Sequence, residues 1–395
     1  MVGGKTMNKE QLLQEYEQVF HEAGKSVYFS PGRINLIGEY TDFNGGHVFP
    51  CAISLGTYGV YAPRTDTKVE MSSANMTDSP IVSFDINDAE PEKGNGKTWA
   101  NYLKGMIVQL RKAGYTFDHG FNLLVHGNLP YGAGLSSSAS IELLMGYILK
   151  AEYDLDVEQL TLVKLGQKVE NDYIGLNSGI MDQFAVGMGK KDNAILLDAN
   201  TLAYNYYPLE LGDYIVVIMN TNKKHSLADS KYNERRAQNE EAVRRLQSAL
   251  DIKYLGELTN DQIDQYSYLI GDYTLIRRAR HVVLENQRTL QARDALLNGD
   301  LELLGRLINA SHVSLKNDYE VSGVELDTLA ETAWQQPGVL GARMIGGGFG
   351  GSGIAIVKKD QVAAFKQNVG RVYEDKIGYK ADFYDAEIAG GPQQL

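Results

Sequence analysis

The chain has 395 residues, 43% of them hydrophobic, which exceeds the usual size of one hydrophobic core, so we expect two lobes with a cleft between them. Its 50 acidic side chains outnumber its 38 Lys and Arg side chains. Because nucleic-acid binding relies on concentrated positive charge, this balance argues against a nucleic-acid partner.

Cysteine usage and apolar runs bear on the compartment. The single cysteine, Cys51, cannot form an internal disulfide, and no apolar run typical of a secretory signal is present. The longest stretch without Lys, Arg, Asp or Glu, residues 119–141, is rich in Gly, Ser, Asn and Pro, whereas a membrane span needs roughly 20 apolar residues. The sequence therefore predicts a cytoplasmic protein without a membrane partner.

The first part of the chain is predicted to be mostly sheet. An amphipathic helical pattern at 9–23 precedes a strand pattern at 26–29, and Ser30-Pro31-Gly32 indicates a turn into a loop-rich insertion at 33–44. Further strand patterns lie at 47–52, 56–62, 68–73 and 81–84.

Helical patterns then become frequent. A helix is predicted at 99–113, stopped by Gly114, followed by a strand at 120–126, a helix opened by the Gly- and Ser-rich stretch 132–138 and a helical pattern at 162–169. Strands are then predicted at 194–197 and 214–219 and long helices between 227 and 334. A Gly-rich hairpin at 346–353 leads into a strand at 354–357. The change to long charged helices near residue 200 predicts two domains, 1–200 and 201–395.

One segment is suited to binding phosphate: Asn128-Leu129-Pro130-Tyr131-Gly132-Ala133-Gly134-Leu135-Ser136-Ser137-Ser138-Ala139-Ser140. Its glycines let backbone N–H groups converge, and the helix start adds the positive end of a dipole. Serine hydroxyls extend the set of donors, and one of them can also meet a metal ion that bridges phosphates. The alternative is an ordinary Gly-rich turn followed by a serine N-cap, and this segment alone does not decide between the two.

Two other segments carry candidate catalytic side chains. Residues 31–47 place Arg33, Glu39 and Asp42 between glycines, and fixed carboxylates suit a polyol while arginine suits phosphate charge. An exposed loop with ordinary surface charges is the alternative for that segment. Residues 170–183 are expected to be a loop, in which the apolar neighbours of Asp182 indicate a partly buried carboxylate that is paired or has a perturbed pKa. Asp182 is the best candidate for a general base.

Taken in chain order, the segments 31–47, 128–140 and 170–183, followed by Gly346-Gly347-Gly348-Phe349-Gly350-Gly351, resemble the galactokinase branch of the GHMP small-molecule kinases over most of the chain. The resemblance implies an α+β fold of two lobes. The N-terminal lobe would be similar to a domain of a small-ribosomal-subunit protein, the C-terminal lobe would be ferredoxin-like, and the active site would lie between them. It also implies transfer of phosphate from ATP to O1 of D-galactose with the help of Mg²⁺.

The resemblance assigns a role to each matching position. Asp182 would accept the proton of the anomeric hydroxyl, and Arg33 would stabilise the transferring phosphoryl group. The positions matching the sugar site are Glu39, Tyr40, Thr41, Asp42, Gly179 and Tyr232. Around the triphosphate, the matching positions are Gly132, Ala133, Gly134, Leu135, Ser136, Ser137 and Ser138. Ser138 and Glu170 match the magnesium ligands. Trp99 and Tyr102 match the positions beside the adenine, and the alternative is that these two side chains are simply part of the helix core.

One departure and several alternatives stay open. Tyr40 stands where the family commonly has histidine, which puts any histidine role at this site in doubt. A related kinase acting on N-acetylgalactosamine, mevalonate or homoserine is the nearest alternative, although Glu39 and Asp42 favour a polyhydroxylated ligand over a charged one. A non-catalytic sensor of galactose and ATP is the other alternative, and the presence of Arg33, Asp182, Ser138 and Glu170 speaks against it.

Overall fold

The structure of the protein is a computed structural model that describes residues 7–76, 79–91, 98–130, 132–176, 178–223 and 228–395. Its helices are α1 Lys9–Phe20, α2 Ala100–Lys112, α3 Ser137–Glu152, α4 Gln159–Lys168, α5 Met181–Gly187, α6 Ala228–Leu246, α7 Asn260–Tyr266, α8 Tyr273–Leu297, α9 Leu301–Ser314, α10 Gly323–Trp334 and α11 Val362–Ile377. Its strands are β1 Ser26–Asn35, β2 His47–Val48, β3 Pro50–Pro63, β4 Lys68–Ser73, β5 Val82–Asp85, β6 Phe121–Gly127, β7 Asn193–Asp198, β8 Tyr204–Pro208, β9 Tyr214–Asn220, β10 Val339–Met344, β11 Ser352–Lys358, β12 Asp382–Ala386 and β13 Gln393–Gln394.

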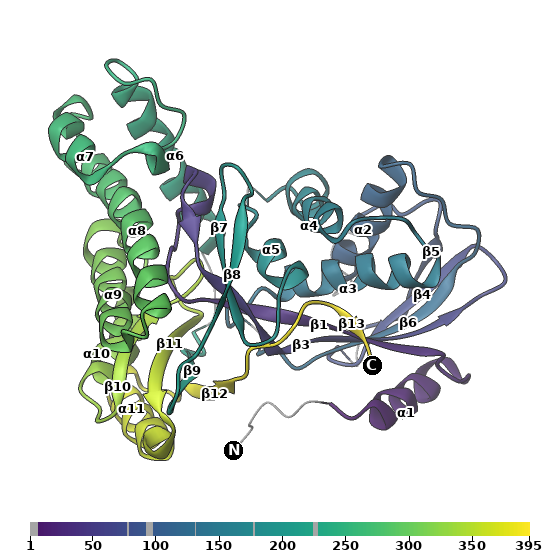
Figure 1. Ribbon diagram of the computed structural model, residues 1–395. Helices are drawn as coiled ribbons and strands as arrows, with labels where there is room; N and C mark the ends of the chain where they lie inside the picture. The colour runs from purple at the N-terminus through teal and green to yellow at the C-terminus, as the bar shows by residue number, and fades with distance from the viewer. Residues whose placement is uncertain (1–6, 77–78, 92–97, 131, 177, 224–227) are drawn as a thin grey trace.

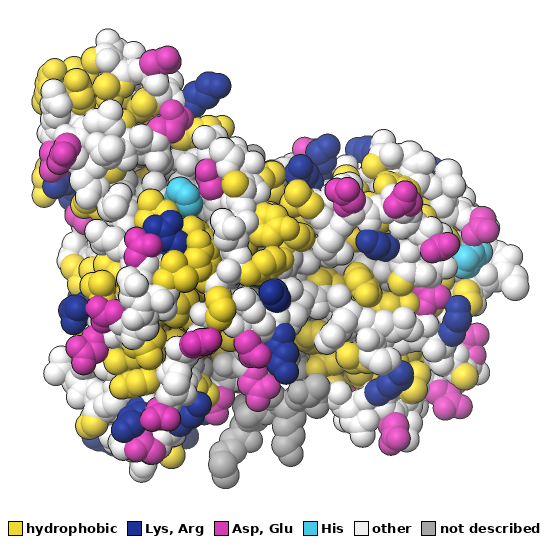
Figure 2. Space-filling view, in the orientation of Figure 1, with side chains coloured by type: hydrophobic (Ala, Val, Ile, Leu, Met, Phe, Trp, Pro, Cys, Tyr) yellow, Lys and Arg dark blue, Asp and Glu magenta, His cyan; other side chains and the backbone are white. Residues whose placement is uncertain are grey.

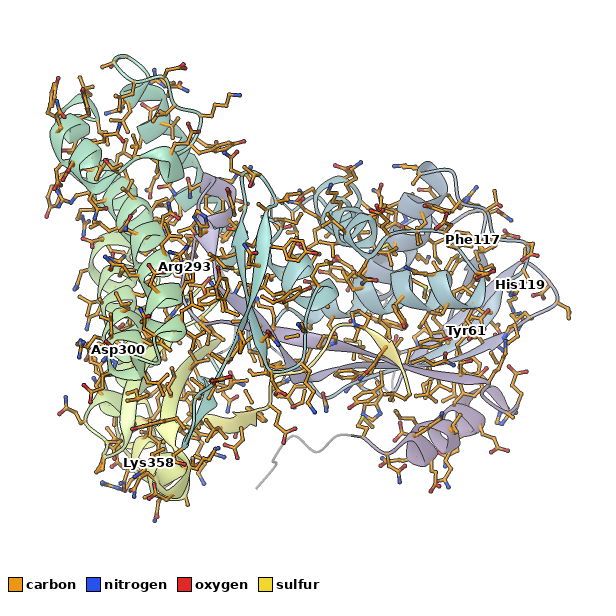
Figure 3. All side chains as sticks on the ribbon, viewed as in Figure 1. Tyr61, Phe117, His119, Arg293, Asp300 and Lys358 are labelled. Atoms are coloured by element: carbon orange, nitrogen blue, oxygen red, sulfur yellow. The ribbon has the colours of Figure 1, made fainter. Side chains whose placement is uncertain are left out.

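The N-terminal lobe is built on a six-stranded sheet in the order β13-β1-β3-β6-β4-β5, in which only the β4–β6 pair is parallel. Helices α2 to α5 cover one face of this sheet, and α1 lies against the other (Figure 1). At the far end of the sheet, Tyr61 on β3 lies beside His119, which comes just before β6 (Figure 3). The sheet and helices α2 to α5 enclose the largest core cluster.

The C-terminal lobe is built on a four-stranded antiparallel sheet in the order β10-β11-β9-β12. Alternate residues of β9 point to opposite faces, as the two-residue period of a strand requires. Val217 and Met219 pack against α10 and α11, whereas Val216 and Ile218 share a core with Ile34 of β1. That second core joins the two lobes.

Long helices form the outer wall of the C-terminal lobe, where α8 and α9 run side by side (Figure 1). Asp300, labelled in Figure 3, is the N-cap of α9, and its side chain accepts a hydrogen bond from the Leu303 N–H at 2.9 Å. On the face drawn in Figure 2, basic and acidic side chains are interspersed. Among the described residues, every helix is too short or too polar to cross a membrane.

Most predicted elements are confirmed within a few residues, but two expectations were wrong. Ser30-Pro31-Gly32 is not a turn: β1 continues through it to Asn35 with a shift of register between Pro31 and Gly32. Proline lacks an N–H for the ladder and is accommodated at such bulges. Consequently Arg33 lies on a strand of the sheet and not in a loop-rich insertion.

The acids Glu170 and Asp182 do not lie on a loop either, although residues 175–176 and 178–180 between them do. Val169–Ile174 continues α4 as a π-helical turn that contains Glu170, and Asp182 lies in the first turn of α5. Both acids therefore stand on helical backbone, which gives them fixed directions. The strands β8, β10, β12 and β13 and the helix α11 were missed, and β13 returns the end of the chain to the N-terminal sheet by pairing with β1. The division into residues 1–200 and 201–395 stays a prediction.

Candidate active site

The centre of the candidate site is a two-point ion pair between β1 and α5. Arg33 Nε lies 2.8 Å from Asp182 Oδ1, and Nη2 lies 3.0 Å from Oδ2. The third nitrogen, Nη1, donates to the Gly134 carbonyl at 2.7 Å. Burial lowers the pKa of the Arg33 guanidinium, but the carboxylates of Asp182 and Glu39 outweigh burial and raise it. Arg33 is therefore a fixed positive charge in a buried position.

Two cavities meet at this ion pair. The first, of about 180 Å³, is lined by Arg33, Glu39, Tyr40, Asp42, Ser178, Gly179, Met181, Asp182, Tyr232, Gly346 and Gly347, and we call it the acidic cavity. The second, of about 250 Å³, is lined by Arg33, Leu129, Pro130, Gly132, Ala133, Gly134, Leu135, Ser136, Ser137, Ser138, Asp182 and Gly347, and we call it the loop cavity. Arg33 and Asp182 line both, so a group placed between them can be reached from either side.

The acidic cavity presents carboxylates held by backbone. Glu39 is 2% exposed, and burial raises its pKa although Arg343 and Arg33 act in the opposite direction. Burial and the nearby Asp182 raise the pKa of Asp42 to about 6. A Cβ atom at Gly179 would lie 1.7 Å from Asp42 Oδ2, so only glycine allows this backbone to approach the carboxylate. The cavity is well below the 300–1,000 Å³ typical of drug-sized pockets, and its acceptors suit a small polyol.

Aromatic side chains form another wall of the acidic cavity. Tyr40 has a positive φ of 66°, and its hydroxyl donates to the Gly347 carbonyl at 2.6 Å. Its ring lies 5.4 Å from that of Tyr232 and 4.6 Å from that of Tyr319. Burial raises the pKa of both Tyr40 and Tyr232 well above the ordinary tyrosine value, so both are neutral donors. This wall offers apolar ring surface together with hydroxyl groups.

Thr41 was predicted to contact the sugar, but it does not line the acidic cavity. Its side chain is fully buried, and its hydroxyl lies 2.6 Å from the His47 carbonyl and 2.9 Å from that of Gly38. Thr41 thus braces the loop that carries Glu39 and Asp42.

The loop cavity is shaped for an anion. Gly132, Gly134 and Ser136 have φ values of 68°, 67° and 61°, which turn successive backbone groups inward. Helix α3 begins at Ser137, so the positive end of its dipole faces the loop. Ser136 Oγ is buried and has no hydrogen-bond partner among the described residues. Because a buried hydroxyl without a partner is unfavourable, a phosphate oxygen at this point would satisfy it.

Ser138 and Glu170 lie together beside the loop. Burial raises the pKa of the Glu170 carboxylate, and the neighbouring hydroxyls of Ser178 and Ser138 partly oppose this. A hydroxyl and a carboxylate are the oxygen ligands that Mg²⁺ takes from proteins when substrate phosphates complete its coordination. No group of three or more His, Cys, Asp or Glu suited to a metal occurs within the described part of the chain. The residues present fit a magnesium ion shared with a nucleotide.

Trp99 and Tyr102 do not line either cavity. Trp99 is the N-cap of α2 and packs against the core of the N-terminal lobe, and Tyr102 is half-buried on the same helix. The indole Nε1 of Trp99 is buried without a partner in the described parts of the chain. Contact of these two side chains with adenine stays a prediction.

Sequence reasoning did not place six residues that line the cavities, which are Leu129, Pro130, Ser178, Met181, Gly346 and Gly347. Leu129 and Pro130 belong to the recognised phosphate segment, and Gly346 and Gly347 to the C-terminal glycine motif, so a signal for these four was present. Ser178 and Met181 flank positions 179 and 182 and gave no signal of their own.

Three family models match this chain. The galactokinase galactose-binding signature covers residues 14–63, the GHMP kinase N-terminal domain 101–190 and the GHMP kinase C-terminal domain 292–375. The chain is 67% identical over 392 residues to a galactokinase of Limosilactobacillus reuteri strain DSM 20016, covering 98% of this chain and 100% of that protein. It is 66% identical over 389 residues to a galactokinase of Lactiplantibacillus plantarum, with 98% and 100% covered.

Solved structures agree on the fold. The crystal structure of Lactococcus lactis galactokinase complexed with galactose superposes with a TM-score of 0.94 at 55% identity, covering 98% of this chain and 99% of the other. A mevalonate kinase superposes with a TM-score of 0.64 at 16% identity, covering 92% and 99%, and this shows the fold alone. The predicted α+β fold of two lobes is confirmed, and the chain belongs to the galactokinase family of the GHMP kinases, which use ATP.

Proposed function

We propose that this protein transfers the γ-phosphoryl group of ATP to O1 of D-galactose, giving galactose 1-phosphate and ADP. The observation that carries the proposal is that Arg33 and Asp182 line both the acidic cavity and the loop cavity. One cavity offers carboxylates for a polyol, and the other offers backbone groups and hydroxyls for phosphates. A sugar hydroxyl and a phosphoryl group would therefore meet beside one base and one cation.

The reaction needs little covalent help from the protein. In the proposed step, Asp182 accepts the proton of the sugar O1 as the bond from O1 to phosphorus forms and the bond from the γ-phosphorus to the leaving oxygen of ADP breaks. Arg33 counters the negative charge of the transferring group, and its bond to the Gly134 carbonyl keeps the guanidinium at the loop. Glu39 and Asp42 would accept hydrogen bonds from other sugar hydroxyls and so fix which hydroxyl faces Asp182.

The Mg²⁺ ion belongs to the same proposal. Ser138 and Glu170 would hold it, because the Ser138 hydroxyl lies near enough to the Glu170 carboxylate to influence its pKa, and both oxygens are ligands that Mg²⁺ accepts. When bound, the ion supplies positive charge to the phosphates of ATP.

The alternatives differ in the charge of the substrate. Mevalonate and homoserine carry a carboxylate, which the carboxylates of Glu39 and Asp42 would repel. N-acetylgalactosamine differs from galactose by one bulky substituent, which a cavity of about 180 Å³ would accommodate poorly. A sensor without catalytic activity would have no need for the Arg33–Asp182 pair beside the loop.

A coupled assay of ADP release tests the proposal directly. Galactose, glucose, N-acetylgalactosamine, mevalonate and homoserine are offered separately with ATP and MgCl₂. We expect rapid release with galactose and a kcat/KM at least about a hundredfold lower with each of the others. Release that does not depend on any sugar, or that is fastest with mevalonate or homoserine, would contradict it.

A further inference from the structure

A fully buried arginine lies behind the acidic cavity without lining it. Arg343, on β10, is 0% exposed, and its Nη2 lies 2.6 Å from Glu39 Oε1 as an ion pair. The other guanidinium nitrogens are fixed by backbone, because Nε donates to the Met344 carbonyl at 2.7 Å and Nη1 to the Leu36 carbonyl at 3.2 Å. The backbone therefore holds the guanidinium beside Glu39, where Nη2 makes the ion pair by proximity and has no hydrogen-bond partner among the described residues.

Glu39 is also held at three other points by the C-terminal lobe. Its carboxylate accepts a hydrogen bond from the Gly346 N–H at 2.8 Å. Its own N–H donates to Glu285 Oε1 at 3.4 Å, and His281 Nε2 lies 3.2 Å from its carbonyl oxygen. A carbonyl oxygen only accepts, so this ring nitrogen carries the hydrogen. Helix α8 and the segment following β10 thus fix a residue that belongs to the N-terminal lobe.

Arg343 supplies positive charge next to two buried carboxylates, those of Glu39 and Glu285. Glu285 is 0% exposed and competes for the same guanidinium at 3.9 Å. Burial alone would raise the pKa of Glu285, but Arg288, His281 and Arg343 together lower it to about 2, so Glu285 is ionised. Without Arg343, Glu285 would keep Arg288, whose Nε lies 2.7 Å from Glu285 Oε2, but the buried Glu39 carboxylate would lose its ion-pair partner, which is strongly unfavourable.

We propose that Arg343 is a positioning residue that sets the affinity for galactose by aiming the Glu39 carboxylate at one sugar hydroxyl. This rests on the proposed function, because it takes galactose as the ligand of the acidic cavity. The residue touches no substrate atom in this account and acts only through Glu39.

The test measures galactose binding in place of turnover. Isothermal titration calorimetry gives the dissociation constants of galactose and of its 2-, 3-, 4- and 6-deoxy analogues for the wild-type protein, Glu39→Gln and Arg343→Lys. In the wild type, one deoxy analogue should bind at least about tenfold more weakly than galactose because it leaves the carboxylate unpaired. Both variants should bind galactose about tenfold more weakly, and both should lose discrimination against that same analogue.

Arg278→Lys is the matched control. Arg278 is an equally buried arginine on α8, 2% exposed, that pairs with Glu320 and does not touch Glu39. It should lower the melting temperature and leave the galactose affinity and the pattern across the deoxy analogues unchanged. A merely structural role of Arg343 would give the same result as this control. If Arg343→Lys binds galactose more weakly but keeps the wild-type pattern, the proposal is overturned.

A second measurement applies should Arg343→Lys fail to fold. A crystal structure of the wild-type protein with galactose should show Glu39 accepting a hydrogen bond from a ring hydroxyl while the ion pair to Arg343 persists. A Glu39 carboxylate turned away from the sugar would overturn the proposal. The proposed function fails separately, through absence of galactose-dependent ADP release, whereas a wild type that does not bind galactose would overturn both.

Discussion

Arg33 donates hydrogen bonds from Nε and Nη2 to both carboxylate oxygens of Asp182, and its third guanidinium nitrogen donates to the Gly134 carbonyl of the glycine loop. This arrangement brings together the three predicted segments: 31–47 through Arg33, 170–183 through Asp182 and 128–140 through Gly134. The three segments are far apart in the sequence, so their convergence is a property of the fold. The proposed base is thus paired with a cation beside the glycine loop, an arrangement that suits phosphoryl transfer to a hydroxyl.

Replacing Arg33 with Lys should lower kcat by about tenfold to a hundredfold, because lysine keeps the charge but loses the fork that engages two oxygens. The KM for ATP should change little. Steady-state kinetics check this against Arg64→Lys, since Arg64 makes the same two-point contact with Asp66 on the surface, at 2.7 and 2.9 Å. Equal effects of the two substitutions would remove the special role of Arg33.

Replacing Glu170 with Gln should raise the MgCl₂ concentration for half-maximal activity by about tenfold or more, because the variant loses the charged oxygen ligand next to Ser138. Asp172→Asn is the control, because Asp172 is an exposed acid of the same π-helical turn. A magnesium titration of ADP release distinguishes the two variants. An unchanged magnesium requirement in Glu170→Gln would show that Glu170 is not a ligand of the metal.

Tyr40→Phe removes the hydroxyl that donates to the Gly347 carbonyl. We expect the free energy of unfolding to fall by about 0.5–1.5 kcal/mol and the KM for galactose to rise severalfold, because Gly347 lines both cavities. Tyr373→Phe is a matched control, since that buried hydroxyl donates to the Thr221 carbonyl at 2.7 Å away from the site. Tyr373→Phe should lower the free energy of unfolding by a similar amount and leave the KM for galactose unchanged. Denaturant unfolding and steady-state kinetics measure both quantities, and an equal KM for galactose in the two variants would contradict the prediction.

Acidification should weaken galactose binding through Asp42. The pKa of Asp42 is raised to about 6 by burial and Asp182, against 3.8 as the ordinary value. Between pH 3.8 and about 6 the folded protein binds more protons at Asp42 than the unfolded chain does, so the free energy of unfolding falls as the pH rises through this window. The ionised carboxylate, however, accepts hydrogen bonds from sugar hydroxyls better than the protonated form. The dissociation constant of galactose should be about tenfold larger at pH 5 than at pH 7.5. Calorimetry on Asp42→Asn should show a smaller pH dependence, and an equal one would assign the effect to another group.

The sequence predicted the secondary structure well wherever the period of apolar residues was long and regular. It failed at Ser30-Pro31-Gly32, because three turn-forming residues in a row look the same whether the chain reverses or makes a bulge in a strand. The deciding partner is Gly56 on β3, where a Cβ atom would lie 2.1 Å from the Ser30 carbonyl. Such long-range backbone contacts are invisible to local patterns.

The candidate site was predicted residue by residue only because its motifs were specific. The local pattern around Asp182 correctly indicated a partly buried, paired carboxylate, but it could not identify Arg33 as the partner. Arg343 shows the opposite limit, since a charged residue in the strand sequence Val339–Met344 gives no local sign of complete burial. The role proposed for it rests on the contact with Glu39, which lies about three hundred positions away in the sequence.

The most direct test of the central claim is Asp182→Asn, measured as galactose-dependent ADP release together with the dissociation constant of ATP. Asparagine keeps the size of the side chain but cannot take the proton of O1. The account predicts that kcat falls by about a hundredfold or more while ATP binds with nearly wild-type affinity. Near-normal turnover in this variant would contradict the assignment of Asp182 as the base.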